Sequence, residues 1–99
     1  MANQNLSVSI IQSEIIWENP EENLKFFNKK IHSISGKTDL VILPEMFPTG
    51  FTMNSRKFAE EMNGSTVEWM RNQAVDNDCA ITGSLIIKEN NNYYNRMIW

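Results

Sequence analysis

The sequence predicts an α/β fold in which a β-strand–α-helix–β-strand unit is followed by a second helix and a β-hairpin. An apolar run at residues 40–43 is typical of a strand buried on both faces, as in a parallel sheet. A segment with helical periodicity, which begins at Asn19-Pro20, precedes this run. Residues 6–11, which precede the helical segment, alternate between apolar and polar as a strand does. A polar turn at residues 89–92 separates two further strand patterns. A crossover of this length implies that the first two strands are parallel and their connection right-handed.

The first strand is predicted at residues 6–11. Leu6, Val8 and Ile10 alternate with Ser7 and Ser9, which gives the strand one apolar face and places it near the sheet edge.

The first helix is predicted to begin at Asn19-Pro20. Asparagine is a good N-cap, and proline suits the first helical position. Gly36 should end the helix. One apolar stripe recurs at helical spacing and should pack on the sheet: Leu24, Phe27, Ile31 and Ile34.

Residues 52–63, in the middle of the chain, are predicted to form a loop with one helical turn. The second helix should begin with a capping box in which Ser65 is the N-cap and Glu68 stands three residues later. It should end at residues 76–78, with four residues facing inward: Val67, Met70, Ala74 and Val75.

The hairpin strands are predicted at residues 80–88 and 93–99. Gly83 inside the first of them suggests a β-bulge or another backbone passing close by.

Glu45 is the candidate catalytic residue. Pro44 has no N–H to give to a sheet, so the buried strand should end there and leave Glu45 at its carboxyl end. Open α/β sheets bind their ligands at that end. Leu43, Met46, Phe47 and Phe51 are expected to shield the carboxylate partly from water. A glutamate in this place is also compatible with an ordinary solvated loop.

Composition limits the remaining classes of function. The net charge of −3 and the pI near 5.0 argue against binding to nucleic acid or to a membrane surface. A single cysteine, Cys79, cannot form an intrachain disulfide and fits a reducing, cytoplasmic location. His32 has no second histidine or cysteine near it, so no metal site is expected.

Several blocks resemble the N-terminal part of the nitrilase superfamily of carbon–nitrogen hydrolases, and most of all its omega-amidase branch, which acts on 2-oxoglutaramate and 2-oxosuccinamate. The longest block runs from Asp39 through Leu43-Pro44-Glu45-Met46-Phe47 to Thr52. The others are Ile16-Trp17-Glu18-Asn19-Pro20 with Asn23, Ile81-Thr82-Gly83-Ser84, and Tyr93-Tyr94-Asn95-Arg96.

This resemblance implies an α-β-β-α sandwich with a Glu-Lys-Cys triad and no cofactor. Glu45 matches the glutamate, the general base. The lysine and the nucleophilic cysteine would lie beyond residue 99, and Cys79, between a helix end and a strand start, lacks the setting of that nucleophile. We therefore expect residues 1–99 to be the N-terminal, incomplete part of a single hydrolase domain, inactive alone. Substrate-binding candidates are Met46, Phe51, Tyr94 and Asn95.

The expected partners are a small amide substrate and a second copy of the chain, because an unpaired sheet edge would pair with another edge. Other amidases or nitrilases of the superfamily would use the same glutamate. A further alternative is a non-catalytic subunit or interaction module that retains part of a hydrolase fold.

Overall fold

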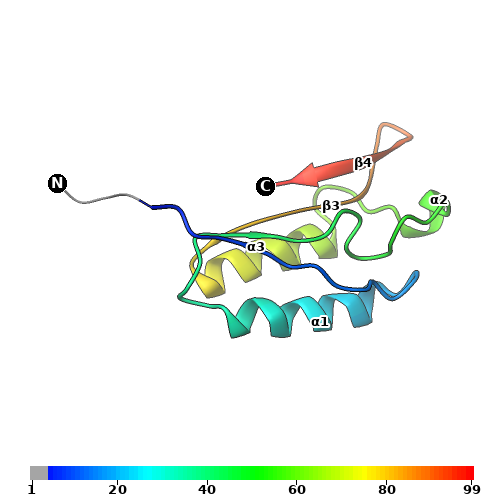
Figure 1. The fold of residues 1–99 in the computed structure, drawn as a ribbon. Helices are drawn as coiled ribbons and strands as arrows, with labels where there is room; N and C mark the ends of the chain where they lie inside the picture. Colours follow the sequence, from blue (N-terminus) through cyan, green and yellow to red (C-terminus); the bar gives the residue numbers. More distant parts are fainter. Residues whose placement is uncertain (1–4) are drawn as a thin grey trace.

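The computed structural model describes residues 5–99, which form one four-stranded sheet with helices on one face (Figure 1). The strand order is β1-β2-β3-β4, with β1 and β2 parallel, β2 and β3 parallel, and β3 and β4 antiparallel. The elements are β1 (Val8–Ile10), α1 (Pro20–Ser33), β2 (Leu40–Ile42), α2 (Ser55–Phe58), α3 (Ser65–Asn77), β3 (Ala80–Glu89) and β4 (Asn92–Ile98).

The predicted β-strand–α-helix–β-strand unit is confirmed. The side chain of Asn19 caps α1 by accepting a hydrogen bond from the N–H of Glu22 at 3.2 Å, and Pro20 is the first helical residue. β2 lies centrally between β1 and β3, so its backbone is hydrogen-bonded on both sides. The single helical turn predicted in the loop before the second helix is α2.

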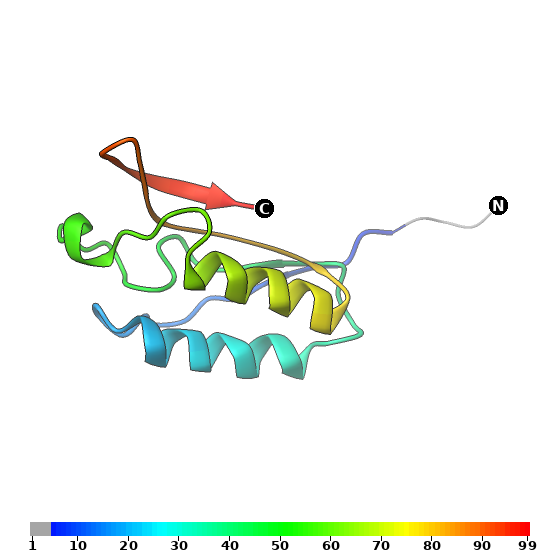
Figure 2. The same ribbon diagram turned by 180° about the vertical axis from the view of Figure 1, so that it is seen from behind.

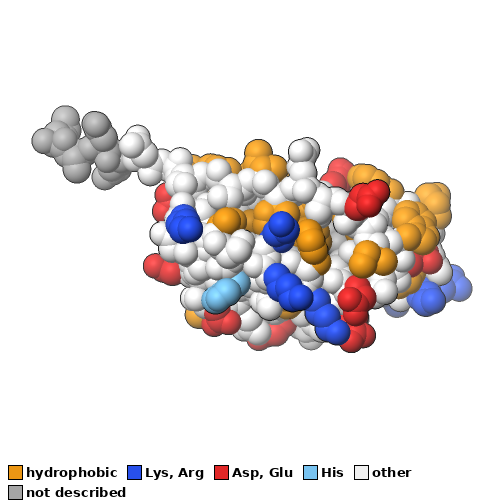
Figure 3. Space-filling view, turned by 60° about the horizontal axis from the view of Figure 1, so that its bottom comes forward, with side chains coloured by type: hydrophobic (Ala, Val, Ile, Leu, Met, Phe, Trp, Pro, Cys, Tyr) orange, Lys and Arg blue, Asp and Glu red, His pale blue; other side chains and the backbone are white. Residues whose placement is uncertain are grey.

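The hydrophobic core lies between the sheet and the two long helices, which run side by side on the same face (Figures 1 and 2). Its fully buried members include Phe27 and Ile31 of α1, Val41 of β2 and Ile87 of β3. The outer side, where α1 lies, carries charged side chains of both signs between hydrophobic patches (Figure 3). None of the helices formed by residues 5–99 is long and apolar enough to cross a membrane.

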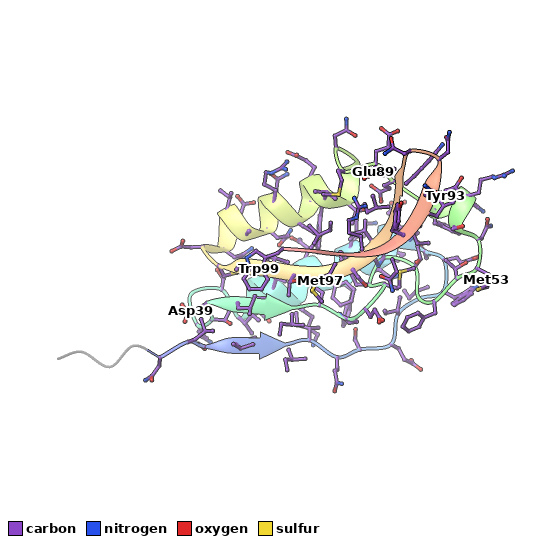
Figure 4. The ribbon with its side chains drawn as sticks, turned by 90° about the horizontal axis from the view of Figure 1, so that it is seen from above. Asp39, Met53, Glu89, Tyr93, Met97 and Trp99 are labelled. Atoms are coloured by element: carbon purple, nitrogen blue, oxygen red, sulfur yellow. The ribbon has the colours of Figure 1, made fainter. Side chains whose placement is uncertain are left out.

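The apolar face of β1 does not pack against the helices. Val8 and Ile10 point to the opposite face of the sheet, and Ile10 is 68% exposed. Across residues 5–99 no helix covers this opposite face, and Met97 of β4 lies on it (Figure 4). The sequence pattern identified an apolar face correctly but could not show which side of the sheet the helices would cover.

The N-terminus of α3 differs from the predicted capping box. Ser65 is the first helical residue and Gly64 is the N-cap. The cap comes from Glu60, whose carboxylate accepts hydrogen bonds from the Thr66 N–H at 2.8 Å and from the Ser65 hydroxyl at 3.2 Å. Backbone bonds between Glu60 and β3 bring this carboxylate to the helix. The inward position of Val75 was also wrong, because that side chain is 74% exposed.

Gly83 is not at a bulge, since the β3–β4 register is continuous, and the atoms nearest to it belong to side chains and not to another backbone. A Cβ atom on Gly83 would lie 2.8 Å from Cδ1 of Phe47 and 3.0 Å from Cβ of Leu43. The hairpin turn is made by Asn90 and Asn91, both with positive φ, as a tight hairpin requires.

Candidate active site

Glu45 lies just beyond the carboxyl end of β2, as predicted. Its side chain is exposed, so the expected shielding from water was wrong for this chain. Leu43 and Phe47 do not cover the carboxylate because both turn into the core on the helical side of the sheet. The carboxylate is thus accessible to a small molecule at the carboxyl end of the parallel strands.

The turn that carries Glu45 is held by β3. Met46 has a φ of +53°, a left-handed conformation that non-glycine residues rarely adopt. Its N–H donates to Oγ of Ser84 at 2.9 Å, and the N–H of Phe47 donates to the Ser84 carbonyl at 3.2 Å. The Met46 carbonyl accepts from the N–H of Gly50 at 2.8 Å. These bonds fix the backbone directly after Glu45.

A hollow of about 390 Å³ lies beside Glu45 on the open face of the sheet. Asn95 of β4 reaches it, because Asn95 faces Ile86 across the hairpin and so points to the face opposite the helices. The structure thus brings together Glu45 and Asn95, which are distant in the sequence. The other lining residues are Ile42, Leu43, Thr82, Gly83, Ser84 and Met97.

The remaining predicted site residues lie elsewhere. Met46 is 4% exposed, and it does not line this hollow. Phe51 is 67% exposed on the loop and does not line it either. Tyr94 faces Ile87 and so points to the helical side of the sheet, where the guanidinium of Arg96 lies 5.0 Å from its ring centre.

Asn23 supports the loops next to the site, a role not predicted from the sequence. It is 2% exposed, and its side-chain amide donates to the carbonyls of Ile16 at 2.8 Å and Pro48 at 2.7 Å. Its side-chain oxygen accepts from the N–H of Ile16 at 2.8 Å. Asn23 therefore ties the loop after Glu45 to the loop after β1. A polar residue on the inward stripe of a helix is the signal that would have found it.

Cys79 lies at the start of β3, away from Glu45, and packs partly against the core. Burial, and to a smaller extent the negative charge of Asp78, raises the pKa of its thiol. A raised pKa reduces the thiolate that nucleophilic attack requires. Residues 5–99 contain no group of three or more His, Cys, Asp or Glu side chains that could hold a metal ion.

The site as described can transfer protons. An exposed carboxylate on a fixed turn can accept or donate a proton, and the Asn95 amide can hydrogen-bond a substrate in the adjoining hollow. Residues 5–99 bring neither a cysteine nor a lysine to this hollow.

The chain is similar to known carbon–nitrogen hydrolases. Residues 7–99 match the family model described as carbon-nitrogen hydrolase. The chain is 31% identical over 93 residues to omega-amidase YafV of Yersinia enterocolitica, covering 94% of this chain and 36% of that protein. It is 30% identical over 93 residues to 2-oxoglutaramate amidase of Bacillus subtilis, covering 92% of this chain and again 36% of the relative.

A solved structure gives the same result. A CN-hydrolase superfamily protein from Xanthomonas campestris, whose crystal structure has an arsenic adduct in the active site, superposes with a TM-score of 0.92 at 36% identity. The match covers 98% of this chain and 37% of the other. The chain thus spans little more than a third of the proteins that it matches. These findings confirm the resemblance and the fold class drawn from the sequence: the chain belongs to the carbon–nitrogen hydrolase family.

Proposed function

We propose that this chain provides the general base of a carbon–nitrogen hydrolase that acts on the omega-amide of a small 2-oxo dicarboxylic acid. The observation that carries the proposal is the exposed Glu45 carboxylate, on a rigid turn beside a hollow at the carboxyl end of a central strand. The names of the relatives, an omega-amidase and a 2-oxoglutaramate amidase, support the choice of substrate.

In this proposal the nucleophile is a cysteine beyond residue 99. Glu45 takes the thiol proton while the sulfur bonds to the amide carbonyl carbon, and a lysine, also beyond residue 99, stabilises the oxyanion together with backbone N–H groups. When the carbon–nitrogen bond breaks, Glu45 passes the proton to the nitrogen and ammonia leaves. Glu45 then takes a proton from water, whose oxygen bonds to the thioester carbon. The carbon–sulfur bond breaks, the acid is released, and Glu45 returns the proton to the departing thiolate.

Asn95 is the proposed substrate-binding residue that has direct geometric support, because it lines the hollow with Glu45. Met46, Phe51 and Tyr94 remain proposals for the pocket of the whole enzyme, whose other walls lie outside this chain. A nitrile or an N-carbamoyl amide would need the same glutamate, so the substrate assay must include these classes. A homodimer in the cytoplasm belongs to the same proposal.

The direct test compares the 99-residue chain with a longer protein expressed from the native reading frame. Each is assayed for ammonia release from 2-oxoglutaramate and 2-oxosuccinamate and, in separate reactions, from a nitrile and an N-carbamoyl amide. We expect turnover of the 2-oxo amides only by the longer protein. Turnover of neither amide by a longer protein that contains the lysine and the cysteine would refute the omega-amidase assignment. A stop codon directly after residue 99 would favour a non-catalytic subunit.

Replacing Glu45 by glutamine tests the proposed base. Glutamine has the same shape but cannot take a proton, so kcat should fall by about a hundredfold or more. The melting temperature should stay unchanged because the side chain is exposed. Glu61→Gln, at another exposed glutamate remote from this hollow, is the matched control and should leave kcat unchanged. Near-normal activity of Glu45→Gln would remove Glu45 from the mechanism.

A further inference from the structure

We infer that Ser84 is a positioning residue for Glu45, whose hydroxyl holds the turn that directs the carboxylate out of the sheet. The inference rests on the proposed function, since it assigns a role to Ser84 in the same reaction. Ser84 does not need to touch the substrate for this role. It acts through the backbone of Met46, the residue that follows Glu45.

The hydrogen bonds between the chain after β2 and strand β3 show why the turn needs support. The N–H of Leu43 donates to the carbonyl of Thr82 at 2.8 Å, and the next such bond runs from the N–H of Phe47 to the carbonyl of Ser84 at 3.2 Å. Between these bonds β3 advances by two residues, whereas the facing chain advances by four. A regular parallel ladder would advance equally on both sides. The extra residues of the chain after β2 are expelled from the hydrogen-bond ladder. Glu45 lies in this expelled segment.

The Ser84 hydroxyl satisfies the backbone group that this expulsion leaves without a ladder partner. The Met46 N–H is directed to the Ser84 side chain, not to a β3 carbonyl, at 2.9 Å. Both residues are buried, with Ser84 at 6% exposure. A buried N–H that loses its only partner is costly, so the turn would have to rearrange.

The direction of that rearrangement follows from the backbone of Met46. Its φ of +53° is unfavourable for a side chain with a Cβ and persists only where neighbouring bonds enforce it. Without the Ser84 hydroxyl, the peptide between Glu45 and Met46 is free to rotate towards a negative φ. Rotation about the N–Cα bond of Met46 turns the preceding residue, Glu45, relative to β3 and so moves its carboxylate relative to the substrate.

The test is Ser84→Ala in the longer, active protein, with steady-state kinetics on 2-oxoglutaramate well below the melting temperature. Displacement of a catalytic group by about 1 Å can cost up to about a hundredfold, so kcat should fall by about tenfold to a hundredfold. KM should change by less than about threefold, because the bond lost is not a substrate contact. If Ser84→Ala does not fold, Ser84→Cys keeps the volume but offers a poor acceptor, and its kcat should fall by about threefold or more.

Thr38→Val is the matched control. Thr38 is also buried, and its hydroxyl donates to the Leu40 carbonyl at 3.0 Å, at the opposite end of the sheet. This variant should lose stability while kcat stays within about twofold of the unmodified protein. An equal fall of kcat in Thr38→Val and Ser84→Ala, or a normal kcat in a folded Ser84 variant, would overturn the positioning role. An inactive unmodified protein would instead refute the proposed function.

Discussion

Replacing Gly83 by alanine should destabilise the protein through a steric conflict at the back of the candidate site. The new Cβ atom would lie 2.8 Å from Cδ1 and 3.0 Å from Cε1 of Phe47, and 3.0 Å from Cβ of Leu43. These distances are well inside van der Waals contact, so one of the neighbours has to move.

Neither neighbour can move without a substantial loss of folding free energy. The Leu43 Cβ is attached directly to the backbone, whose N–H is bonded to β3. The Phe47 ring is fully buried, and its centroid lies 5.8 Å from those of both Phe27 and Trp69. Extra carbon atoms in a well-packed core cost about 1–3 kcal/mol, and two rigid neighbours place Gly83→Ala in the upper half of that range, at about 2–3 kcal/mol.

Urea unfolding of the longer protein, followed by tryptophan fluorescence, measures this cost. The mechanism is tested by a double-mutant cycle with Phe47→Ala, which removes both ring atoms that clash. If the clash is the cause, the double variant should be more stable than the sum of the two single changes predicts, by about 1 kcal/mol or more. Additive effects would refute the steric reasoning. Gly36→Ala is the control, because a Cβ there meets nothing within 4 Å and only the positive φ of +81° opposes it.

Two further measurements test other parts of the structure. Asp78→Asn should accelerate alkylation of Cys79 near neutral pH, because the Asp78 charge raises the thiol pKa and so lowers the thiolate fraction. Asparagine also tolerates the left-handed φ of residue 78. Asp76→Asn is the control, and an alkylation rate of Asp78→Asn that is unchanged and equal to that of the control would contradict the prediction. The 99-residue chain should self-associate through its open sheet face in sedimentation experiments, and Ile10→Lys should shift it towards monomer. Val75→Lys, at an equally exposed apolar residue on α3, should not do so; equal effects would contradict the role of the face.

The capping signal of α1 and the proline and turn signals of the sequence were reliable, because neighbouring residues decide these features, whereas helical periodicity placed Val75 wrongly. Asn19 and Pro20 fix the start of α1 because both act within the first helical turn. The strand that ends before Pro44 follows from the missing N–H of proline, and the hairpin turn follows from residues that tolerate positive φ. The choice of Ser65 as a cap failed because Glu60, held by β3, supplied the acceptor from outside the helix.

The sequence by itself determined the order of strands and helices, the family, and Glu45 as the candidate base, because these depend on local periodicity and on one contiguous block around residue 45. The tertiary structure alone decided the surroundings of that glutamate. Asn95 reaches its hollow through strand pairing, and the Ser84 hydroxyl holds its turn across the sheet. Met46 and Ser84 are 38 positions apart and Glu45 and Asn95 are 50 apart, and no local pattern specifies the register that brings them together.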